Sequence, residues 1–556
     1  MSGPDMDRAS ASYLRCAALA ASLDPERSPE ALLQVVKVAA RIAAEFHCFR
    51  FADGLIENQA LRVASVLPPR VLPAQLSIAS CGKRSRARRV LHVASCVFDV
   101  GGHSRMIAEW AARDVDTTHF LVTTHQEGAP PPSLARAIQD TGGQTWVLGY
   151  SSPAFVRAQW LRTLASLDFD FVILHTAPYD PISVAAFGVP GGPPVALLNH
   201  ADHVFWIGGS VSDAIINLRP VGAELSAARR FATQNCTIPI PVSKPPATRD
   251  RAGARRQLGL PAAQRVLVSV GRSLKYTPSR THDFYRVARR LLLEHPAAHL
   301  YVLGPDDSHY LKHNAGGTVP ERLHLLGPVT NPLPWFAAAD VYLESFPFGS
   351  QTATLEAAVM GPAVVLALAP STPLLAASDV AFDGLIHNAS NENEYCRRVS
   401  AALDRQPSRH TDAEQLAAAV LTHHVHDHWL AWLHQVYETL GRLPHTPHTL
   451  PIAEPQETAT DRAIMEWQRS TNSATASVQA ADYLLHAANL AREAGEWTAS
   501  LRLLGLSSQI SGFSTAQLTA AAKVIGRASF RQVTARMSPP AVNDTAADSQ
   551  HIDGNL

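Results

Sequence analysis

Residues 340–365, DVYLESFPFGSQTATLEAAVMGPAVV, hold the pattern that decides the fold. A short apolar run (340–346) leads into a Pro-Phe-Gly turn, and a helical stretch opens at Ser350. A glycine-proline pair ends that stretch before the next apolar run, 362–368. Strand, helix and strand in this order form one unit of a parallel α/β sheet. The stretch therefore predicts an open parallel sheet.

Apolar runs of the same kind occur in two sets along the middle of the chain. The first set comprises residues 90–98, 119–125, 145–149, 169–176 and 194–200; the second comprises 265–271, 299–304, 322–327, 340–346 and 362–368. Such runs without polar alternation, separated by helix-length segments, are typical of parallel strands buried on both faces. A Pro-rich segment (238–250) divides the two sets. The predicted fold class is α/β, with two doubly wound Rossmann-like domains over 89–240 and 251–413.

Helical segments are expected on both sides of these domains. Apolar spacing predicts helices within 1–88 and 461–535, the second region containing a helical hairpin with Gly495 at its turn. Between the second domain and that region we expect a helix with an apolar side (414–440) and a Pro-rich linker (441–460). The polar residues 536–556 predict a disordered tail.

The composition excludes several classes of protein. The 48 basic and 48 acidic residues of the 556 cancel, so the chain has no net field to hold nucleic acid or an anionic membrane. Six cysteines without a CxxC pair disfavour a disulfide framework and a structural zinc site. No apolar run approaches the roughly 20 residues that span a bilayer, and the N-terminus does not resemble a signal peptide. We expect a cytoplasmic protein without a nucleic-acid partner or a transmembrane segment.

Candidate ligand-binding residues of the second domain follow its strands, where open α/β sheets bind their ligands. Arg272 and Lys275 come directly after the first strand of that domain and can clamp a diphosphate, or be ordinary surface cations. Ser350, Gln351 and Thr352 open a helix, where they can cap it or contact a phosphate together with the free N–H groups.

Two further features fit the same ligand. Glu356 lies one helical turn beyond the hydroxyl residues, where its carboxylate can accept the hydroxyls of a ribose. In the first domain, Gly101 and Gly102 precede a helix that starts near His103, and paired glycines allow a phosphate or sugar to approach backbone N–H groups. The loop is not a GxGxxG fingerprint, which disfavours a nicotinamide enzyme.

Candidate catalytic residues follow the last strand of the first set. His200, Asp202 and His203 suit proton transfer, because histidine titrates near neutral pH, and His103 is a second candidate. Trp206 can stack on an acceptor sugar. The alternative interpretation of this loop is a polar turn with a packed tryptophan.

Two apparent metal motifs are interpreted as structural. Asp168 and Asp170 have the DxD form, but they precede a strand and so lie away from the ligand-binding edge. His424 and His428 have the spacing of a zinc pair on a helix, but no carboxylate motif accompanies them, and a solvated helix face is favoured. We therefore expect no metal.

With these residues in view, 89–440 resemble the GT-B-fold glycosyltransferases. The resemblance rests on GGHSR (101–105), VGRSLK (270–275) and the stretch 323–365. Within that stretch FPFGSQTATLEA is most similar to O-linked N-acetylglucosaminyltransferases and bacterial adhesin glucosyltransferases.

The resemblance implies a division of labour between the domains. The second domain would hold a nucleotide-sugar, with a UDP-sugar as the first choice, and the first domain a glycan or protein acceptor. Arg272 and Lys275 would contact the diphosphate, 350–352 the phosphates and Glu356 the ribose. The helix 414–440 would cross back to the first domain. No cofactor is implied besides this co-substrate.

One departure bears on the mechanism. Retaining members usually carry two glutamates eight residues apart, but Phe348 stands eight residues before Glu356, and Glu344 lies four residues too early. This favours an inverting reaction, in which a base deprotonates the acceptor hydroxyl.

Other functions stay open at this point. The α/β core can be a catalytically silent scaffold whose helical ends bind a partner, or a nucleotide-sugar epimerase of the same fold. The helical ends can recognise a macromolecular acceptor or join copies of the chain in a homo-oligomer.

Overall fold

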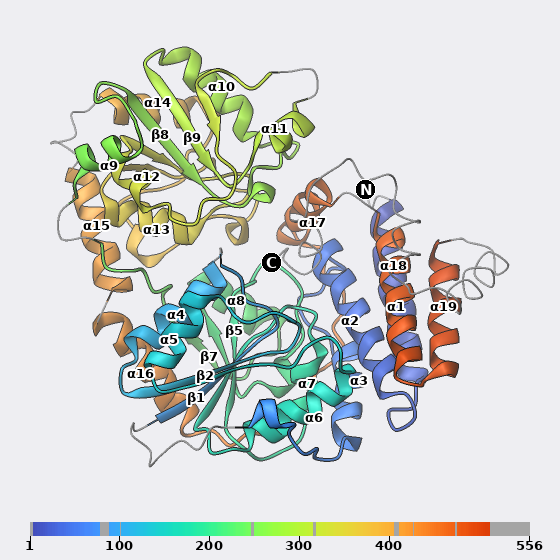
Figure 1. Cartoon of the computed structure of the whole chain (residues 1–556). Helices are drawn as coiled ribbons and strands as arrows, with labels where there is room; N and C mark the ends of the chain where they lie inside the picture. Colours follow the sequence, from blue (N-terminus) through green and yellow to red (C-terminus); the bar gives the residue numbers. More distant parts are fainter. Residues whose placement is uncertain are drawn as a thin grey trace.

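The computed structural model of the chain describes residues 4–77, 88–99, 102–245, 249–314, 318–404, 411–425, 427–472 and 475–511. Two α/β domains lie one above the other, and a block of helices lies beside them (Figure 1). The predicted tail (536–556) and the predicted helical residues beyond 511 lie outside the described residues, as does most of the basic segment before the first strand.

The first domain is a seven-stranded parallel sheet with strand order β3-β2-β1-β4-β5-β6-β7. Its strands are β1 Arg88–Ala94, β2 Thr117–Thr123, β3 Thr145–Val147, β4 Phe171–His175, β5 Val195–Asn199, β6 Ala214–Asn217 and β7 Asn235–Thr237. Its helices are α4 Gly102–Arg113, α5 Pro132–Asp140, α6 Ala154–Ala165, α7 Pro181–Phe187 and α8 Pro220–Arg229. Strands β6 and β7 are additional to the five predicted runs.

The second domain is a five-stranded parallel sheet with strand order β10-β9-β8-β11-β12. Its strands are β8 Arg265–Val270, β9 Ala298–Leu303, β10 Leu323–Leu325, β11 Val341–Leu343 and β12 Ala363–Val365. Its helices are α9 Arg251–Gln257, α10 Phe284–Glu294, α11 Asp307–His313, α12 Leu333–Ala338, α13 Gln351–Met360 and α14 Glu392–Asp404. Both sheets run outward in two directions from their first strand, so the predicted pair of doubly wound domains is confirmed.

The predicted crossing helix is a pair of helices, α15 Thr411–His424 and α16 Asp427–Leu440. Leu416 and Val420 of α15 pack against α13 in the second domain. Trp429, Leu433 and Tyr437 of α16 pack under the sheet of the first domain. The pair therefore joins both domains along one side (Figure 1).

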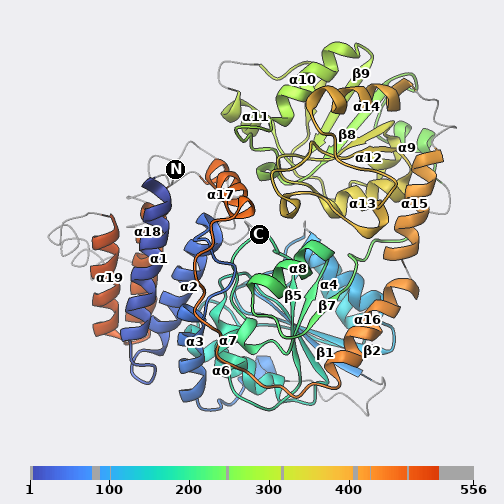
Figure 2. The same ribbon diagram turned by 180° about the vertical axis from the view of Figure 1, so that it is seen from behind.

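The segment between α16 and α17 (Ala459–Thr471) runs extended along the first domain (Figure 2). His445 makes hydrogen bonds of 2.9 Å to Asp213 and 2.7 Å to the Phe187 carbonyl, and Leu450 is buried. Prolines prevent a helix here, and the buried side chains of His445 and Leu450 hold the otherwise largely exposed segment against the first domain.

The two helical ends of the chain form one block. It contains α1 Pro4–Ser22, α2 Pro29–Phe46, α3 Gly54–Val66, α18 Ala476–Glu493 and α19 Trp497–Ser511, with α2 and α19 both packed on α18. Glu496 accepts hydrogen bonds from the backbone N–H groups of Glu30 (2.8 Å) and Ala31 (2.7 Å), which caps α2 from the other end of the chain. Gly495 has a φ of 86° at the predicted hairpin turn.

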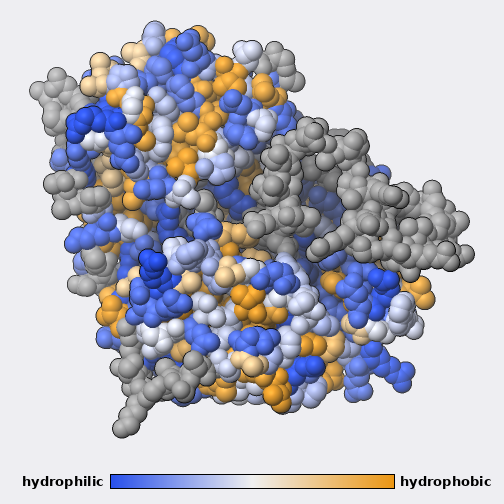
Figure 3. Space-filling model, viewed as in Figure 1, coloured by the Kyte–Doolittle hydropathy of each residue, from blue (hydrophilic) through white to orange (hydrophobic). Residues whose placement is uncertain are grey.

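Hydrophilic and hydrophobic residues are interspersed over the face shown in Figure 3. No helix in the described part of the chain is long and apolar enough to cross a membrane.

Candidate active site between the two domains

The site lies where the carboxyl ends of both sheets face each other. The glycine loop of the first domain reaches the start of α13 in the second, because a Cβ atom added to Gly102 would lie 3.4 Å from the Thr352 Oγ1. Gly101 lies outside the described residues. Loops from both domains therefore meet at one helix N-terminus, where backbone N–H groups favour an anion.

Lys275 lies in a short turn (Ser273–Tyr276) directly after β8. Its Nζ donates a hydrogen bond of 2.7 Å to the Gly349 carbonyl and lies 4.7 Å from the centre of the Phe348 ring. Burial, and then the neighbouring Arg272 cation, lower the pKa of Lys275 to about 7. Arg272, at the N-cap position of the same turn, is exposed. Both cations stand at the edge of the sheet where α13 begins.

The residues that open α13 do not cap it conventionally. Ser350 occupies the N-cap position but makes no side-chain cap bond, because its hydroxyl is hydrogen-bonded to Ser345 at 2.8 Å. Gln351 donates to Asp379 at 3.0 Å. Thr352 is partly buried and faces the glycine loop. The Ser350 hydroxyl therefore leaves the first N–H groups of the helix for another acceptor.

Glu356 is buried and forms an ion pair with Arg105 across the cleft. Burial raises the pKa of Glu356, and Arg105 opposes that shift. A cavity of about 160 Å³ adjoins the pair and is also lined by Lys244, Asn331 and Met360. Contact with a ribose remains a prediction for Glu356, and Arg105 is a partner that the sequence did not indicate.

The three catalytic candidates after β5 have different surroundings. Both oxygens of Asp202 accept hydrogen bonds from Arg219, at 2.6 and 2.8 Å. Although burial disfavours the charged form, Arg219 holds the pKa of Asp202 well below its usual range. Arg219 also donates to the carbonyls of Leu374 (2.7 Å) and Ala376 (2.5 Å) in the second domain. As a correction, Asp202 joins the domains and is not free to accept a proton.

His200 and His203, on either side of Asp202 in the sequence, have different neighbours. Burial lowers the pKa of His200 to about 4, and its ring stacks on His103 with centroids 4.5 Å apart. His203 packs against Phe348, with centroids 4.7 Å apart, and against Trp467 of α17 at 5.5 Å. Burial also lowers the pKa of His203. Both histidines are therefore neutral near pH 7, as a proton acceptor must be.

Trp206 is not placed to stack on an acceptor sugar, which corrects that expectation. Its side chain is 3% exposed. Its Nε1 donates to Asn199 at 3.1 Å, and the Arg230 guanidinium lies 4.5 Å from the ring centre. The other interpretation of this loop, a turn with a packed tryptophan, describes Trp206 correctly.

A smaller cavity of about 40 Å³ lies at the carboxyl edge of the first sheet. It is lined by His103, His125, His175, His200, Asp180 and Lys37, among others. Lys37 comes from α2, so the N-terminal helices contribute to this part of the site. His125, His175 and Lys37 were not predicted from the sequence, although the predicted strand runs 119–125 and 169–176 each carry a histidine at or next to their last residue.

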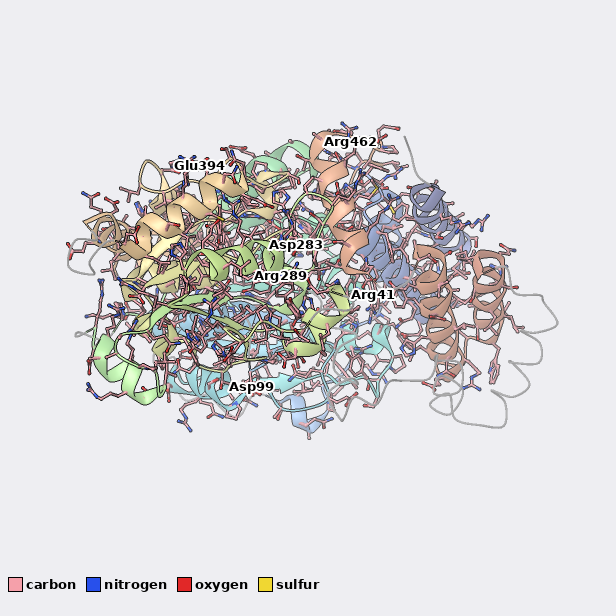
Figure 4. All side chains as sticks on the ribbon, turned by 90° about the horizontal axis from the view of Figure 1, so that it is seen from above. Arg41, Asp99, Asp283, Arg289, Glu394 and Arg462 are labelled. Atoms are coloured by element: carbon pink, nitrogen blue, oxygen red, sulfur yellow. The ribbon has the colours of Figure 1, made fainter. Side chains whose placement is uncertain are left out.

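The helix α17 also borders the cleft. Trp467 is 8% exposed, and its ring centre lies 4.8 Å from that of Phe348, next to Lys275. Thr460 at the start of the helix is hydrogen-bonded to Thr372 of the second domain at 3.3 Å. Figure 4 shows Arg462, on α17, at the border between the second domain and the helical block. The C-terminal helices thus reach the site, which the sequence alone did not indicate.

The two apparent metal motifs have other roles. Asp168 pairs with Arg89 at 3.4 Å, and Asp170 accepts from the Arg89 backbone N–H at 2.7 Å, at the amino end of β4. His424 is buried and not solvated as expected, with its ring nitrogens 2.7 Å from the Ile240 carbonyl and 2.8 Å from Asp379. Within the described residues, no group of three or more potential ligands is placed to hold a metal ion.

Comparisons with known proteins address the second domain most directly. Residues 264–405 match the family model described as glycosyl transferases group 1, whereas a search of curated proteins gave no match. A mutant O-GlcNAc transferase from Thermobaculum terrenum is similar in structure at 14% identity, with 74% of this chain and 78% of that chain covered and a TM-score of 0.47. HepE from Anabaena, solved with UDP-glucose, gives 16% identity, coverages of 64% and 100% and a TM-score of 0.46. The second α/β domain of this chain therefore matches the glycosyl transferases group 1 family.

Proposed function

We propose that the protein is a glycosyltransferase that binds a nucleoside-diphosphate sugar between its two domains and transfers the sugar to a hydroxyl or a protein side chain. The observation that carries the proposal is the convergence of Lys275, Arg272 and the start of α13 on one edge of a domain that matches a glycosyltransferase family. A UDP-sugar is the donor that we expect from the motif resemblance.

The second domain would stabilise the leaving group. As the bond between the sugar and the diphosphate breaks, negative charge develops on the diphosphate, and preorganised cations and N–H groups stabilise that charge. Lys275 and Arg272 supply the cations, and the uncapped start of α13 supplies the N–H groups. We propose that this charge stabilisation replaces a metal ion.

The first domain would bind the acceptor and supply the base. The small cavity lies next to the glycine loop and is lined by the neutral histidines His103 and His200. A glutamate at the position typical of retaining members is replaced by Phe348, whose ring instead contacts Lys275. We therefore propose an inverting reaction with a histidine of this cavity as the base.

Nucleotide binding tests the proposal without knowledge of the acceptor. Thermal unfolding would be followed with UDP, GDP, dTDP or ADP, in the presence of EDTA. A ligand at 100 times its Kd stabilises the folded state by about 2.7 kcal/mol. We expect one diphosphate, UDP first, to stabilise the parent and not Lys275→Ala. Lys312→Ala is the matched control, because Lys312 is an exposed lysine of the same domain.

Two results would contradict the proposal. Stabilisation of Lys275→Ala equal to that of the parent would remove Lys275 from the site. Binding of none of the four diphosphates would leave a silent scaffold, whose partner would then be sought on the helical block.

A further inference from the structure

Three histidines on neighbouring strands form a buried row beside the small cavity. The His92 Nδ1 lies 2.8 Å from the His175 Nε2, and the His92 Nε2 lies 2.9 Å from the His119 Nδ1. The strand register explains the row, because His119 pairs with Val90 and His175 with Ala94, two residues to either side of His92. Residues two apart point to the same face of a sheet. All three histidine side chains are fully buried.

A carboxylate lies at one end of the row. The Asp114 Oδ2 is 3.4 Å from the His119 Nε2 and accepts a hydrogen bond of 2.6 Å from the Tyr437 hydroxyl of α16. Tyr437 in turn accepts from the Trp110 Nε1 at 3.0 Å. The His119 Nε2 has no hydrogen-bond partner among the described residues, but at 3.4 Å the negative charge of the ionised carboxylate favours a proton on this nitrogen.

The Asp114 carboxylate, by favouring a proton on the His119 Nε2, sets the tautomer of every histidine in the row. A neutral imidazole has one N–H group and one lone pair. With its proton on Nε2, His119 accepts at Nδ1 from the His92 Nε2. His92 then accepts at its own Nδ1 from the His175 Nε2. The lone pair of the His175 Nδ1 is left over, and this buried atom has no hydrogen-bond partner among the described residues.

His175 also lines the cavity in which we place the acceptor. A cavity of about 40 Å³ has room for a hydroxyl group or a water molecule. The titratable side chains around His175 are the histidines of the row and, from α4 and the loop after β5, His103 and His200. Burial lowers the pKa of His92, His103 and His200, so these neighbours are neutral near pH 7, and Lys37 of α2 supplies the ammonium on the cavity lining.

We propose that His175 is the general base of the transfer and that Asp114, His119 and His92 are positioning residues that hold its Nδ1 unprotonated. The proposal rests on the proposed function and names its base. The acceptor oxygen forms a bond to the anomeric carbon as its proton moves to the His175 Nδ1. The bond between that carbon and the diphosphate oxygen breaks, and the diphosphate leaves with the electron pair. The proton stays on His175, and the ionised Asp114 carboxylate at the other end of the row balances the positive charge that the ring gains.

The tautomers can be read without any activity. In the protein labelled with ¹⁵N-histidine, we expect nitrogen chemical shifts that place the proton of His92, His119 and His175 on Nε2. A proton on the His175 Nδ1 in the free protein would overturn the proposal. This measurement uses the parent chain and does not depend on the folding of a variant.

His175→Gln tests the base itself. The glutamine amide can still donate to the His92 Nδ1, but it cannot accept a proton near pH 7. The assay is release of UDP from UDP-glucose with water as the acceptor. General-base catalysis contributes about 10²–10⁴-fold, so we expect at least a ~100-fold lower kcat with the thermal shift by UDP unchanged. His175→Gly should regain turnover when imidazole is added, which a purely structural residue would not show.

His299→Gln is the matched control, because His299 forms a similar hydrogen bond of 3.0 Å to His324 on neighbouring strands of the second domain. If His175→Gln releases UDP as fast as the parent, the base role of His175 is wrong, while the proposed function still stands. A parent chain that binds no nucleoside diphosphate would overturn the proposed function, and the base role with it.

Discussion

The affinity for a nucleoside diphosphate should depend on the protonation of one lysine. Burial and the Arg272 cation lower the pKa of Lys275 to about 7 in the free protein. A bound diphosphate favours the charged amine, so binding above that pH requires Lys275 to take up a proton. One pKa unit corresponds to 1.36 kcal/mol, so Kd should rise close to tenfold for each pH unit above 7.

Between about pH 7.5 and pH 9.5 we expect UDP to bind ~75-fold more weakly, or by about 2.6 kcal/mol, at the higher pH. Isothermal titration calorimetry in buffers of different ionisation enthalpy would also show uptake of close to one proton at about pH 8.5. Glu344, the carboxylate that acts on Lys275, has a pKa raised to about 7 by burial, so it is about three-quarters ionised at pH 7.5 and almost fully ionised at pH 9.5. Its titration therefore changes by only about a quarter of a proton and cannot produce the ~75-fold slope.

Lys275→Arg is the control, because a guanidinium stays charged at every pH in this range. We expect UDP binding by this variant to be almost independent of pH. A parent whose affinity is the same at both pH values would refute the reasoning. An equal slope in Lys275→Arg would show that another group takes up the proton.

Three other changes test the packing around the site. Arg219→Met leaves the Asp202 carboxylate buried without its partner, so the free energy of unfolding measured in urea should fall by about 3–5 kcal/mol; an unchanged midpoint would contradict a joint between the domains. Trp467→Ala removes a buried ring that packs on Phe348, and should cost about 3–5 kcal/mol in the same assay if α17 unfolds with the domains. Burial raises the pKa of Glu57 from 4.5 to about 7, so its contribution to stability is full below about pH 4.5 and is lost as the pH rises through 7. Glu57→Gln should therefore be more stable than the parent at about pH 8 and lose its advantage at about pH 5, and equal urea midpoints at both pH values would contradict this sign.

The strands of both domains were predictable because each is a short apolar run with a loop at its end. Strand β7 was missed because it is short and directly precedes the Pro-rich segment that marks the domain joint, and β6, a run of four residues, was also missed. Lys275 and the start of α13 were also predictable, since they follow strands directly. Local sequence is sufficient where the residues that form a feature are close together in the chain.

Contacts between distant parts of the chain were not predictable in this way. Glu496 caps α2 from more than 460 residues away, and Arg105 pairs with Glu356 across the domains. Asp202 was expected to transfer a proton, whereas Arg219, 17 residues farther on, donates to both of its carboxylate oxygens. Side-chain partners of this kind follow from the packing of whole domains.

The histidine row is an intermediate case. A single histidine within an apolar run indicates only a buried strand residue. The strand order places β2 and β4 on the two sides of β1, and only then do His119 and His175 approach His92. The topology of the sheet, and no local motif, creates this arrangement.

Turnover of a nucleotide-sugar tests the proposed activity most directly. UDP release from UDP-glucose would be measured for the parent, for Lys275→Ala and for the control Lys312→Ala. Because removal of one charge-stabilising contact costs about 10²–10³-fold in rate, we predict that Lys275→Ala is at least ~100-fold slower and that Lys312→Ala is unaffected. Equal turnover by the parent and Lys275→Ala would contradict a donor site between the two domains.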